Sequence, residues 1–413
     1  MARVPGIGED FFIIGGGMAG LMTSIWLRRL LPGTAVTLIE KGRPCCHWML
    51  RKGLHEPIVG NALSAENLAM AGGGPPPALL ERALAAWPGE ATLGWLRELD
   101  TRPQLSGNGA IQVDGALLQK RLCEAACAAG VRLREHCAVQ DVRSQPGGGF
   151  RLWSAEEALG EAAAVVFATG GERNHGMALL RETGPPVATP RAGFLRLRPA
   201  SRRFGQRLEG LSREVRVTLE KTGAESVGRI HCGTRGLEGP VMADLSARSG
   251  EDLAGWRYRF ALQVDWVPQW SAGGLRKAFI EKTEQGGRQP VGEDPLPGFS
   301  VRHWNYFLEK ARVDPALPWP RTKDRKRNAL IERLKRERIP IEGMGLPAGE
   351  RAWQGGVDPS ALLPESGGVR GKPGLYCCGE MLDFLYPPGG YQASAVWASA
   401  YHTATGIAGK RPD

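Results

Sequence analysis

Three glycines near the start of the chain, Gly15, Gly17 and Gly20, have the spacing G-x-G-x-x-G. The apolar run Phe11–Ile14 before them predicts a buried strand, and the periodic apolar residues after Gly20 indicate a helix. In this context the first glycine permits a tight turn, the second lets the backbone approach a pyrophosphate, and the third lets helix and strand pack closely. The helix N-terminus then offers free N–H groups and a partial positive charge to phosphates. The expected chemistry is therefore binding of a dinucleotide.

An acidic residue follows at the distance that this motif requires. A second strand is predicted at Ala35–Ile39, and Glu40 comes directly after it, twenty residues beyond Gly20. Its carboxylate is placed to accept hydrogen bonds from ribose hydroxyls. Taken alone, this fingerprint leaves NAD, NADP and FAD open as the dinucleotide.

The elements that must position these residues fall into three segments. Up to about Ala188, strands and helices alternate; a short strand is expected around Val139 and a doubly buried one at 162–167. From 189 to 347, strands with alternating polarity are separated by arginine-rich turns and helical stretches. After 348 the α/β pattern returns and ends in a helix from about Gln392 to Ile407. We expect a discontinuous α/β domain, residues 1–188 and 348–413, with an inserted antiparallel β and helical domain, residues 189–347.

Composition sets the class of protein. The 413 residues are 42% hydrophobic and 23% charged, which is typical of a globular protein with more than one domain. Neither a secretory signal nor an apolar stretch long enough to span a bilayer is present in the sequence, so we expect a cytoplasmic protein without membrane contact. The net charge of +10 favours anionic partners, and a flavin dinucleotide, an acyl-CoA and RNA would all fit.

Cysteines and histidines give weaker signals. The eight cysteines contain no C-x-x-C pair, so no metal site is predicted. The adjacent pairs Cys45-Cys46 and Cys377-Cys378 leave a redox role open, although burial as small apolar residues is the favoured interpretation. Weak candidates for a catalytic acid or base are His47, His175 and Tyr391. For the histidines a hydrogen-bonded loop position is favoured, so the catalytic group stays unassigned.

The stretch Arg321–Arg338 is rich in basic residues. It predicts either a solvated helix face, with Leu330, Ile331 and Leu334 packed inward, or an RNA footprint. Interspersed acids dilute its charge and no RNA-binding module signature accompanies it, so the solvated face is favoured.

Further glycine turns, at 168–171 and 379–391, complete a pattern that resembles the family of YhiN-like, BaiN-like and aminoacetone oxidase-like FAD-binding flavoproteins. The matching motifs are A-T-G-G at Ala168–Gly171, G-L-x-G-P at Gly236–Pro240, G-G-V at Gly355–Val357, P-G-L-Y-x-x-G-E-x-L-D at Pro373–Asp383 and G-G-Y at Gly389–Tyr391. The chain departs from the family in lacking its G-G-G-R-C-N loop between Lys41 and Asn67 and in carrying Gln392 where the family has asparagine.

The resemblance implies a Rossmann-type FAD-binding domain with an inserted, barrel-like antiparallel β and helical domain. It implies backbone contacts of Val139 to adenine, contacts of Gly379 and Asp383 to ribitol and pyrophosphate, and helix N–H groups at Gly390–Gln392 facing the flavin pyrimidine. The implied cofactor-binding residues are Gly15, Gly17, Met18, Ala19, Gly20, Glu40, Lys41, Val139, Ala168, Thr169, Gly170, Gly379, Glu380, Asp383, Gly390, Tyr391 and Gln392.

The function that the resemblance implies is that of an FAD-dependent oxidoreductase. It would reduce a C=C bond or carry out an amine-type oxidation of a small molecule by hydride transfer at the flavin. Because the sequence has a single full dinucleotide fingerprint, NAD(P)H would serve only as a transient electron donor. Two alternatives stay open: flavin-dependent reduction of uridine in ribosomal RNA, and a flavin-binding protein without catalysis. The oligomeric state is not predicted.

Overall fold

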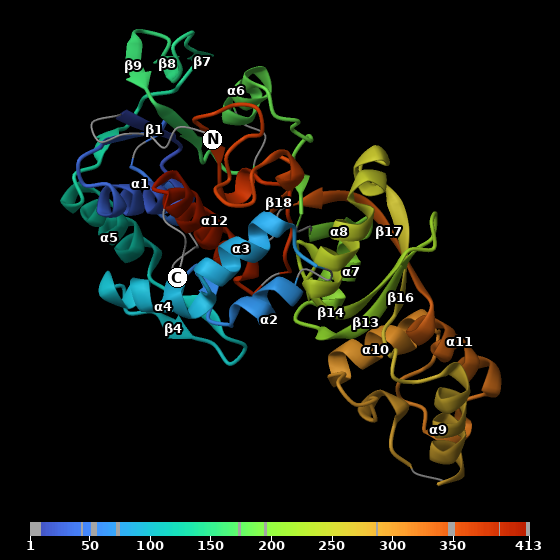
Figure 1. The fold of residues 1–413 in the computed structure, drawn as a ribbon. Coiled ribbons are helices and arrows are strands. Elements are labelled where there is room, and N and C mark those ends of the chain that lie inside the picture. The colour runs from blue at the N-terminus through green and yellow to red at the C-terminus, as the bar shows by residue number, and fades with distance from the viewer. Residues whose placement is uncertain are drawn as a thin grey trace. The chain divides into compact units, whose positions relative to one another are not determined.

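The computed structural model describes residues 10–42, 44–50, 56–71, 75–171, 175–193, 196–285, 288–345, 352–387 and 389–409. The chain divides into two compact units. We call residues 1–192 with 349–413 the sheet unit, and residues 193–348 the barrel unit. Figure 1 shows the elements of both.

The sheet unit is built on a parallel sheet of five strands among the described residues. In spatial order these are β19 (Leu375–Cys377), β10 (Ala164–Phe167), β1 (Asp10–Ile14), β2 (Ala35–Ile39) and β6 (Arg132–Arg134). Every residue of β10 is buried, as expected for an apolar strand that is covered on both faces. In the register, Ile14 pairs with Ile39 and with Phe167, so β1, β2 and β10 end at the same level. The residues that follow these strands therefore meet at one edge of the sheet.

Helix α1 (Met18–Leu30) packs between α12 (Tyr391–Ile407) and α5 (Gly115–Ala128), so the first and the last helix of the chain lie side by side (Figure 1). Aromatic rings strengthen this contact. Trp26 of α1 meets Tyr401 of α12 edge to face with ring centroids 4.9 Å apart, and Trp95 meets Trp397 of α12 at 5.5 Å. Such pairs add to the free energy of simple apolar burial. They fix α12 against the helices of the N-terminal part.

Smaller elements complete the sheet unit. Further helices are α2 (Ala65–Met70), α3 (Ala78–Ala86), α4 (Gly89–Glu98) and α6 (His175–Thr183). The side sheets are β3 (Ile58–Asn61) with β5 (Ala110–Gln112) and β4 (Gln104–Leu105), then β7 (Asp141–Ser144) with β8 (Phe150–Trp153) and β9 (Ala158–Ala162), and β11 (Arg191–Ala192) with β18 (Trp353–Gln354). The strand expected around Val139 is wrong: β7 begins only at Asp141, because the backbone before it binds the sheet edge through Cys137 N–H and Glu40 C=O.

The barrel unit contains a closed antiparallel barrel. Its strands, in spatial order, are β12 (Arg196–Pro199), β15 (Gly236–Glu238), β14 (Glu225–Gly233), β13 (Ser212–Leu219), β16 (Phe260–Asp265) and β17 (Glu337–Gly345). Alternate residues of β13 are buried, as its polarity pattern predicts. Helices of this unit are α7 (Arg202–Leu208), α8 (Pro240–Gly255), α9 (Ala272–Glu284), α10 (Val301–Lys310) and α11 (Asp324–Lys335). The predicted fold class, a Rossmann-type domain with an inserted barrel and helices, is confirmed.

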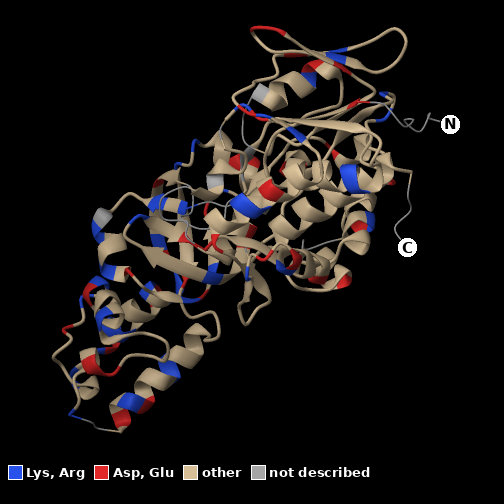
Figure 2. Cartoon of the chain, turned by 90° about the vertical axis from the view of Figure 1, so that its left-hand side faces the viewer, with Lys and Arg blue, Asp and Glu red and all other residues tan. Residues whose placement is uncertain are grey.

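Charged residues of both signs are interspersed along the chain (Figure 2). On α11, Leu330, Ile331 and Leu334 are buried, as the helix-face interpretation of the basic stretch expects. Within the described residues, no helix is long and apolar enough to cross a bilayer.

Glu337 is a buried carboxylate in the barrel unit, only 4% exposed. Tyr306 Oη donates to its Oε1 at 2.6 Å and Trp266 Nε1 to its Oε2 at 2.8 Å. Burial raises the pKa of Glu337 above its ordinary value, although these two hydrogen bonds oppose the shift. The network ties α10 and the end of β16 to β17.

A pH dependence of stability follows from Glu337. Because its pKa is raised on folding, the folded state binds more protons than the unfolded state between the ordinary and the raised value, and stability falls as pH rises through that window. Glu337→Gln removes this titration, so we expect the thermal stability of wild type to fall relative to the variant as pH rises from 4 to 8. Glu332→Gln, at an exposed position of α11, is the control. Parallel melting curves for wild type and Glu337→Gln across the range would contradict the assignment.

Candidate dinucleotide site

The glycine turn joins β1 directly to α1. Gly17 is the N-cap of α1, and among the described residues no side chain caps this helix and no acidic residue lies in its first turn. The first N–H groups of α1 therefore lack intrahelical acceptors, which suits an anion. A Cβ at Gly20 would lie 1.9 Å from the Gly15 carbonyl oxygen, whereas a Cβ at Gly17 would meet nothing within 4 Å. Gly20 thus serves close packing, and Gly17 faces open space.

Glu40 lies beside this turn at the end of β2. Its Oε2 accepts a hydrogen bond from Gly16 N–H at 2.6 Å and its Oε1 one from Gly42 N–H at 2.8 Å. Two backbone N–H groups thus fix the Glu40 carboxylate next to the glycine turn. Its oxygens keep further lone pairs that can accept from another donor. The Glu40 carboxylate can therefore accept one more hydrogen bond, for example from a hydroxyl group.

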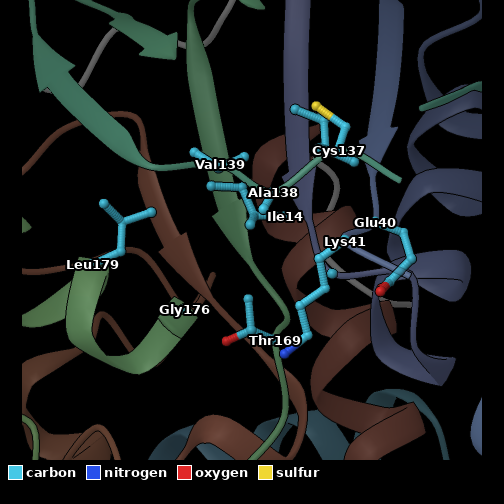
Figure 3. Close-up of a pocket in the computed structure, with 11 residues that line it drawn as sticks. Ile14, Glu40, Lys41, Cys137, Ala138, Val139, Thr169, Gly176 and Leu179 are labelled. Atoms are coloured by element: carbon cyan, nitrogen blue, oxygen red, sulfur yellow. The ribbon is translucent and has the colours of Figure 1, made fainter. Parts of the chain in front are cut away.

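A pocket opens at the level where β1, β2 and β10 end. It is lined by Ile14, Gly15, Ile39, Glu40, Lys41, Cys137, Ala138, Val139, Thr169, Gly176 and Leu179. Figure 3 shows the apolar side chains of Ala138 and Val139 beside Ile14, and the Lys41 side chain extending toward Thr169. The pocket therefore combines an apolar wall with polar groups at its edge, as an adenosine would need. Ile14, Ile39, Cys137, Ala138, Gly176 and Leu179 line the pocket but were not predicted as site residues. The first four lie in predicted strands, and Gly176 and Leu179 follow the glycine turn at 168–171.

The C-terminal motif forms a second group of predicted residues. Gly379 N–H donates to Ser399 Oγ at 3.0 Å, which joins this turn to α12. Asp383 Oδ1 accepts from Gly355 N–H at 2.8 Å, and Glu380 Oε1 accepts from Trp353 N–H at 3.3 Å. Both acids thus hold the 353–355 segment.

At the start of α12, Gly390 is the N-cap and has a left-handed backbone with φ of 87°. Tyr391 is half-buried. The Gln392 side chain is buried and points to the backbone of 384–386, where Tyr386 N–H donates to its Oε1 at 2.9 Å. The Gln392 carboxamide is therefore bound by the protein's own backbone and is not directed to a ligand.

The candidate acid or base residues His47, His175 and Tyr391 belong to three separate helical elements. His47 is exposed in the short helical turn His47–Leu50. His175 begins α6, next to the pocket residue Gly176, and its side chain lies outside the described part. Among the described residues, no group of three or more His, Cys, Asp or Glu could hold a metal ion.

The adjacent cysteine pairs are buried and have free thiols. Burial raises the pKa of Cys45, Cys46 and Cys377 well above the ordinary value and that of Cys378 to about 12. Thiolates, the reactive form, are therefore strongly disfavoured.

A labelling experiment checks this interpretation. Because Cys127 is exposed, we expect an alkylating reagent at neutral pH to modify it first in the native protein. Cys45, Cys46, Cys377 and Cys378 should react only after denaturation, as read by peptide mass spectrometry. Rapid native labelling of either adjacent pair would favour a redox role instead.

The chain is similar in sequence to known proteins. A family model described as the HI0933-like protein Rossmann domain matches residues 9–406. The 3-dehydro-bile acid delta(4,6)-reductase of Clostridium scindens is 24% identical over 258 residues, which cover 60% of this chain and 62% of that protein. The match therefore spans less than two thirds of that relative's length.

Solved structures similar to this chain include two steroid enzymes. The 3-ketosteroid delta1-dehydrogenase of Sterolibacterium denitrificans is 10% identical, with 98% of this chain and 100% of that chain covered and a TM-score of 0.51. The 3-ketosteroid-delta4-(5alpha)-dehydrogenase of Rhodococcus jostii RHA1 is 14% identical, with 97% and 96% covered and a TM-score of 0.48. At such identities the first similarity supports the fold alone.

Proposed function

Since the chain belongs to the HI0933-like family of Rossmann-domain proteins, a family of FAD-dependent oxidoreductases, we propose that it binds one FAD in the sheet unit and reduces a carbon–carbon double bond of a small molecule. The observation that carries the proposal is that β1, β2 and β10 end at the same level. The residues that follow them, Gly15, Glu40 and Ala168, therefore lie at one edge of the sheet. Ligands of open α/β sheets bind at this edge.

The residues present fit FAD. The open space at Gly17 and the uncapped start of α1 would take the pyrophosphate, and Glu40 would accept hydrogen bonds from the adenosine ribose. Val139 and Ala138 would cover the adenine, with Lys41 and Thr169 at the edge of the pocket. Met18, Ala19 and Gly170 would lie along the dinucleotide, and Gly379, Glu380 and Asp383 along its ribitol side. Tyr391 and the N–H groups at Gly390–Gln392 would face the flavin.

FAD, when bound, would supply hydride transfer, and the protein would supply position and electrostatics. The partial positive charge at the start of α12 would stabilise negative charge that develops on the pyrimidine side of a reduced flavin. His175 precedes Gly176, which lines the pocket proposed for adenosine. A role of His175 in the reaction at the flavin ring is therefore not favoured.

The substrate class is proposed from the relative that reduces a bile acid. A cyclic unsaturated ketone of steroid type is the expected substrate, with NADH or NADPH as a donor that visits the flavin transiently. The test is anaerobic, with the flavin spectrum as readout. We expect a nicotinamide to bleach the bound flavin within seconds and an unsaturated 3-ketosteroid to reoxidise it. Bleaching by primary amines but not by nicotinamides would favour amine-type oxidation, and no response to either would favour a flavin-binding protein without catalysis.

Ribosomal RNA is a second candidate substrate because of the +10 charge. The ion pairs that basic residues of 321–338 form with acidic residues give RNA binding less support. Lys335 pairs with Asp265 at 2.5 Å, Arg338 pairs with Glu220 at 2.9 Å, and Arg327 pairs with Asp324. Binding to RNA fragments that weakens steeply with salt would favour this candidate, and no binding at low salt would remove it.

A further inference from the structure

Two buried carboxamide side chains form hydrogen bonds to the backbone at, and just before, the turn from which α12 starts. Asn61, at the end of β3, is 0% exposed and Gln392, in the first turn of α12, is 3% exposed. We propose that Asn61 and Gln392 are positioning residues that hold the N-terminus of α12 in place and thereby set the reduction potential of bound FAD. This inference rests on the proposed function, because it takes the flavin pyrimidine to face that helix end.

Asn61 grips the turn from the N-terminal part of the chain. Its Nδ2 donates to the carbonyl oxygens of Gly389 at 2.8 Å and Asn108 at 3.2 Å. No donor among the described residues reaches its Oδ1. The opposite amide orientation would point Oδ1 at two carbonyl oxygens, so the donors fix the orientation shown. A buried acceptor left unpaired is costly, and the side chain keeps its place because it satisfies both carbonyls.

The backbone around Asn61 reinforces this grip. Asn61 N–H donates to Ser394 Oγ at 2.8 Å, and Trp397 Nε1 donates to the Val59 carbonyl oxygen at 2.7 Å. Strand β3 therefore follows the first two turns of α12. A Cβ at Gly390 would lie 1.9 Å from the Gly60 carbonyl oxygen, so β3 and the helix start touch without room for a side chain.

Gln392 binds the segment that leads into this turn. Its Oε1 accepts from Tyr386 N–H at 2.9 Å, and its Nε2 donates to the Phe384 carbonyl oxygen at 3.4 Å. Gln392 thus binds the segment before the turn, and Asn61 binds the turn itself. Together Asn61 and Gln392 form what we call the carboxamide clamp.

The clamp acts through the field of the helix end. The partial charge of a helix terminus falls off within one turn, so its effect on a ligand depends on position. A reduced flavin carries more negative charge on its pyrimidine side than an oxidised one. Loosening the helix start should therefore weaken the binding of reduced FAD more than that of oxidised FAD, and the potential should fall. A residue that serves the fold alone would lower both affinities equally.

The variants are Asn61→Ala, the isosteric Asn61→Asp, which turns the donor into an acceptor, and Gln392→Met, which keeps volume without hydrogen bonds. Asn67→Ala is the matched control, because Asn67 is an exposed asparagine six positions further on. Amide hydrogen exchange of the apoprotein reports the clamp without FAD. We expect exchange at 394–397, the first N–H groups that donate within α12, to rise at least tenfold in the three clamp variants and to stay unchanged in the control.

The potential of the FAD-loaded protein reports the consequence. We expect the preference for reduced over oxidised FAD to fall up to tenfold in the clamp variants, which is about 30 mV for a two-electron couple. Unchanged exchange at 394–397 would overturn the clamp, and a wild-type potential despite faster exchange would overturn its effect on the flavin. If one Asn61 variant fails to fold, the other and Gln392→Met give the same reading. A wild-type protein that cannot be loaded with FAD would remove the proposed function and the effect on potential with it, while the exchange result would still decide the clamp.

Discussion

Replacing Gly17 with valine is expected to abolish FAD binding while the apoprotein stays folded. Gly17 has φ of −77° and ψ of −174°, an extended backbone that valine adopts readily. A Cβ there would meet no protein atom within 4 Å, so the fold has no reason to resist it. The added side chain would fill the space in which the backbone must approach the pyrophosphate. FAD titration by fluorescence, together with thermal unfolding of the apoprotein, separates the two effects.

Two glycine variants serve as controls for this result. Gly147→Val adds the same side chain at a turn between β7 and β8 where a Cβ also meets nothing within 4 Å, and it should leave affinity unchanged. Gly20→Val should instead destabilise the protein, because its Cβ would lie 1.9 Å from the Gly15 carbonyl oxygen. Affinity of Gly17→Val within about threefold of wild type would place the pyrophosphate elsewhere.

Replacing Glu40 with alanine is expected to weaken FAD binding by roughly 10- to 100-fold. A hydrogen bond to a charged group contributes about 1.5–3 kcal/mol, and each 1.4 kcal/mol is a factor of about ten in the dissociation constant. The carboxylate also holds the N–H groups of Gly16 and Gly42, so its loss loosens the glycine turn as well. Calorimetric titration of the apoprotein measures the change.

A neighbouring glutamate separates these two contributions. Glu135 Oε1 accepts from Cys45 N–H at 3.0 Å and supports the same loop, but Glu135 does not line the pocket. Glu135→Ala should therefore change FAD affinity less than about threefold. Equal losses in the Glu40 and Glu135 variants would mean that Glu40 acts only on the loop and not on the ribose.

Much of the fold follows from short-range patterns. The apolar strands, the glycine turn and Glu40 are adjacent in sequence, so their spacing already fixed strand, turn and helix, and the fold class that they predict is confirmed. Alternating polarity indicated the strands of the insertion. The predicted strand around Val139 was wrong because its backbone is used at the sheet edge, a long-range contact with Glu40 that local propensity does not contain.

The candidate site was only partly predictable, for the same reason. Gly17 and Glu40 were predicted from their spacing, whereas the Asn61 side chain binds the carbonyl oxygen of Gly389, which is far away in sequence. The sole signal of Asn61 is an amide at the end of the apolar run Ile58–Val59, which a loop residue would equally give. A side chain can be turned outward or inward by packing alone, and Gln392 is turned inward.

The central claim, one FAD held at the carboxyl edge of the sheet, is tested most directly by reconstitution. Apoprotein is titrated with FAD, freed of excess by gel filtration, and its flavin absorbance is compared with its protein concentration for wild type and Gly17→Val. We predict one FAD per chain for wild type and none for Gly17→Val, with both proteins folded. A folded wild-type protein that stays colourless, or a Gly17→Val variant that retains one FAD per chain, would contradict the claim.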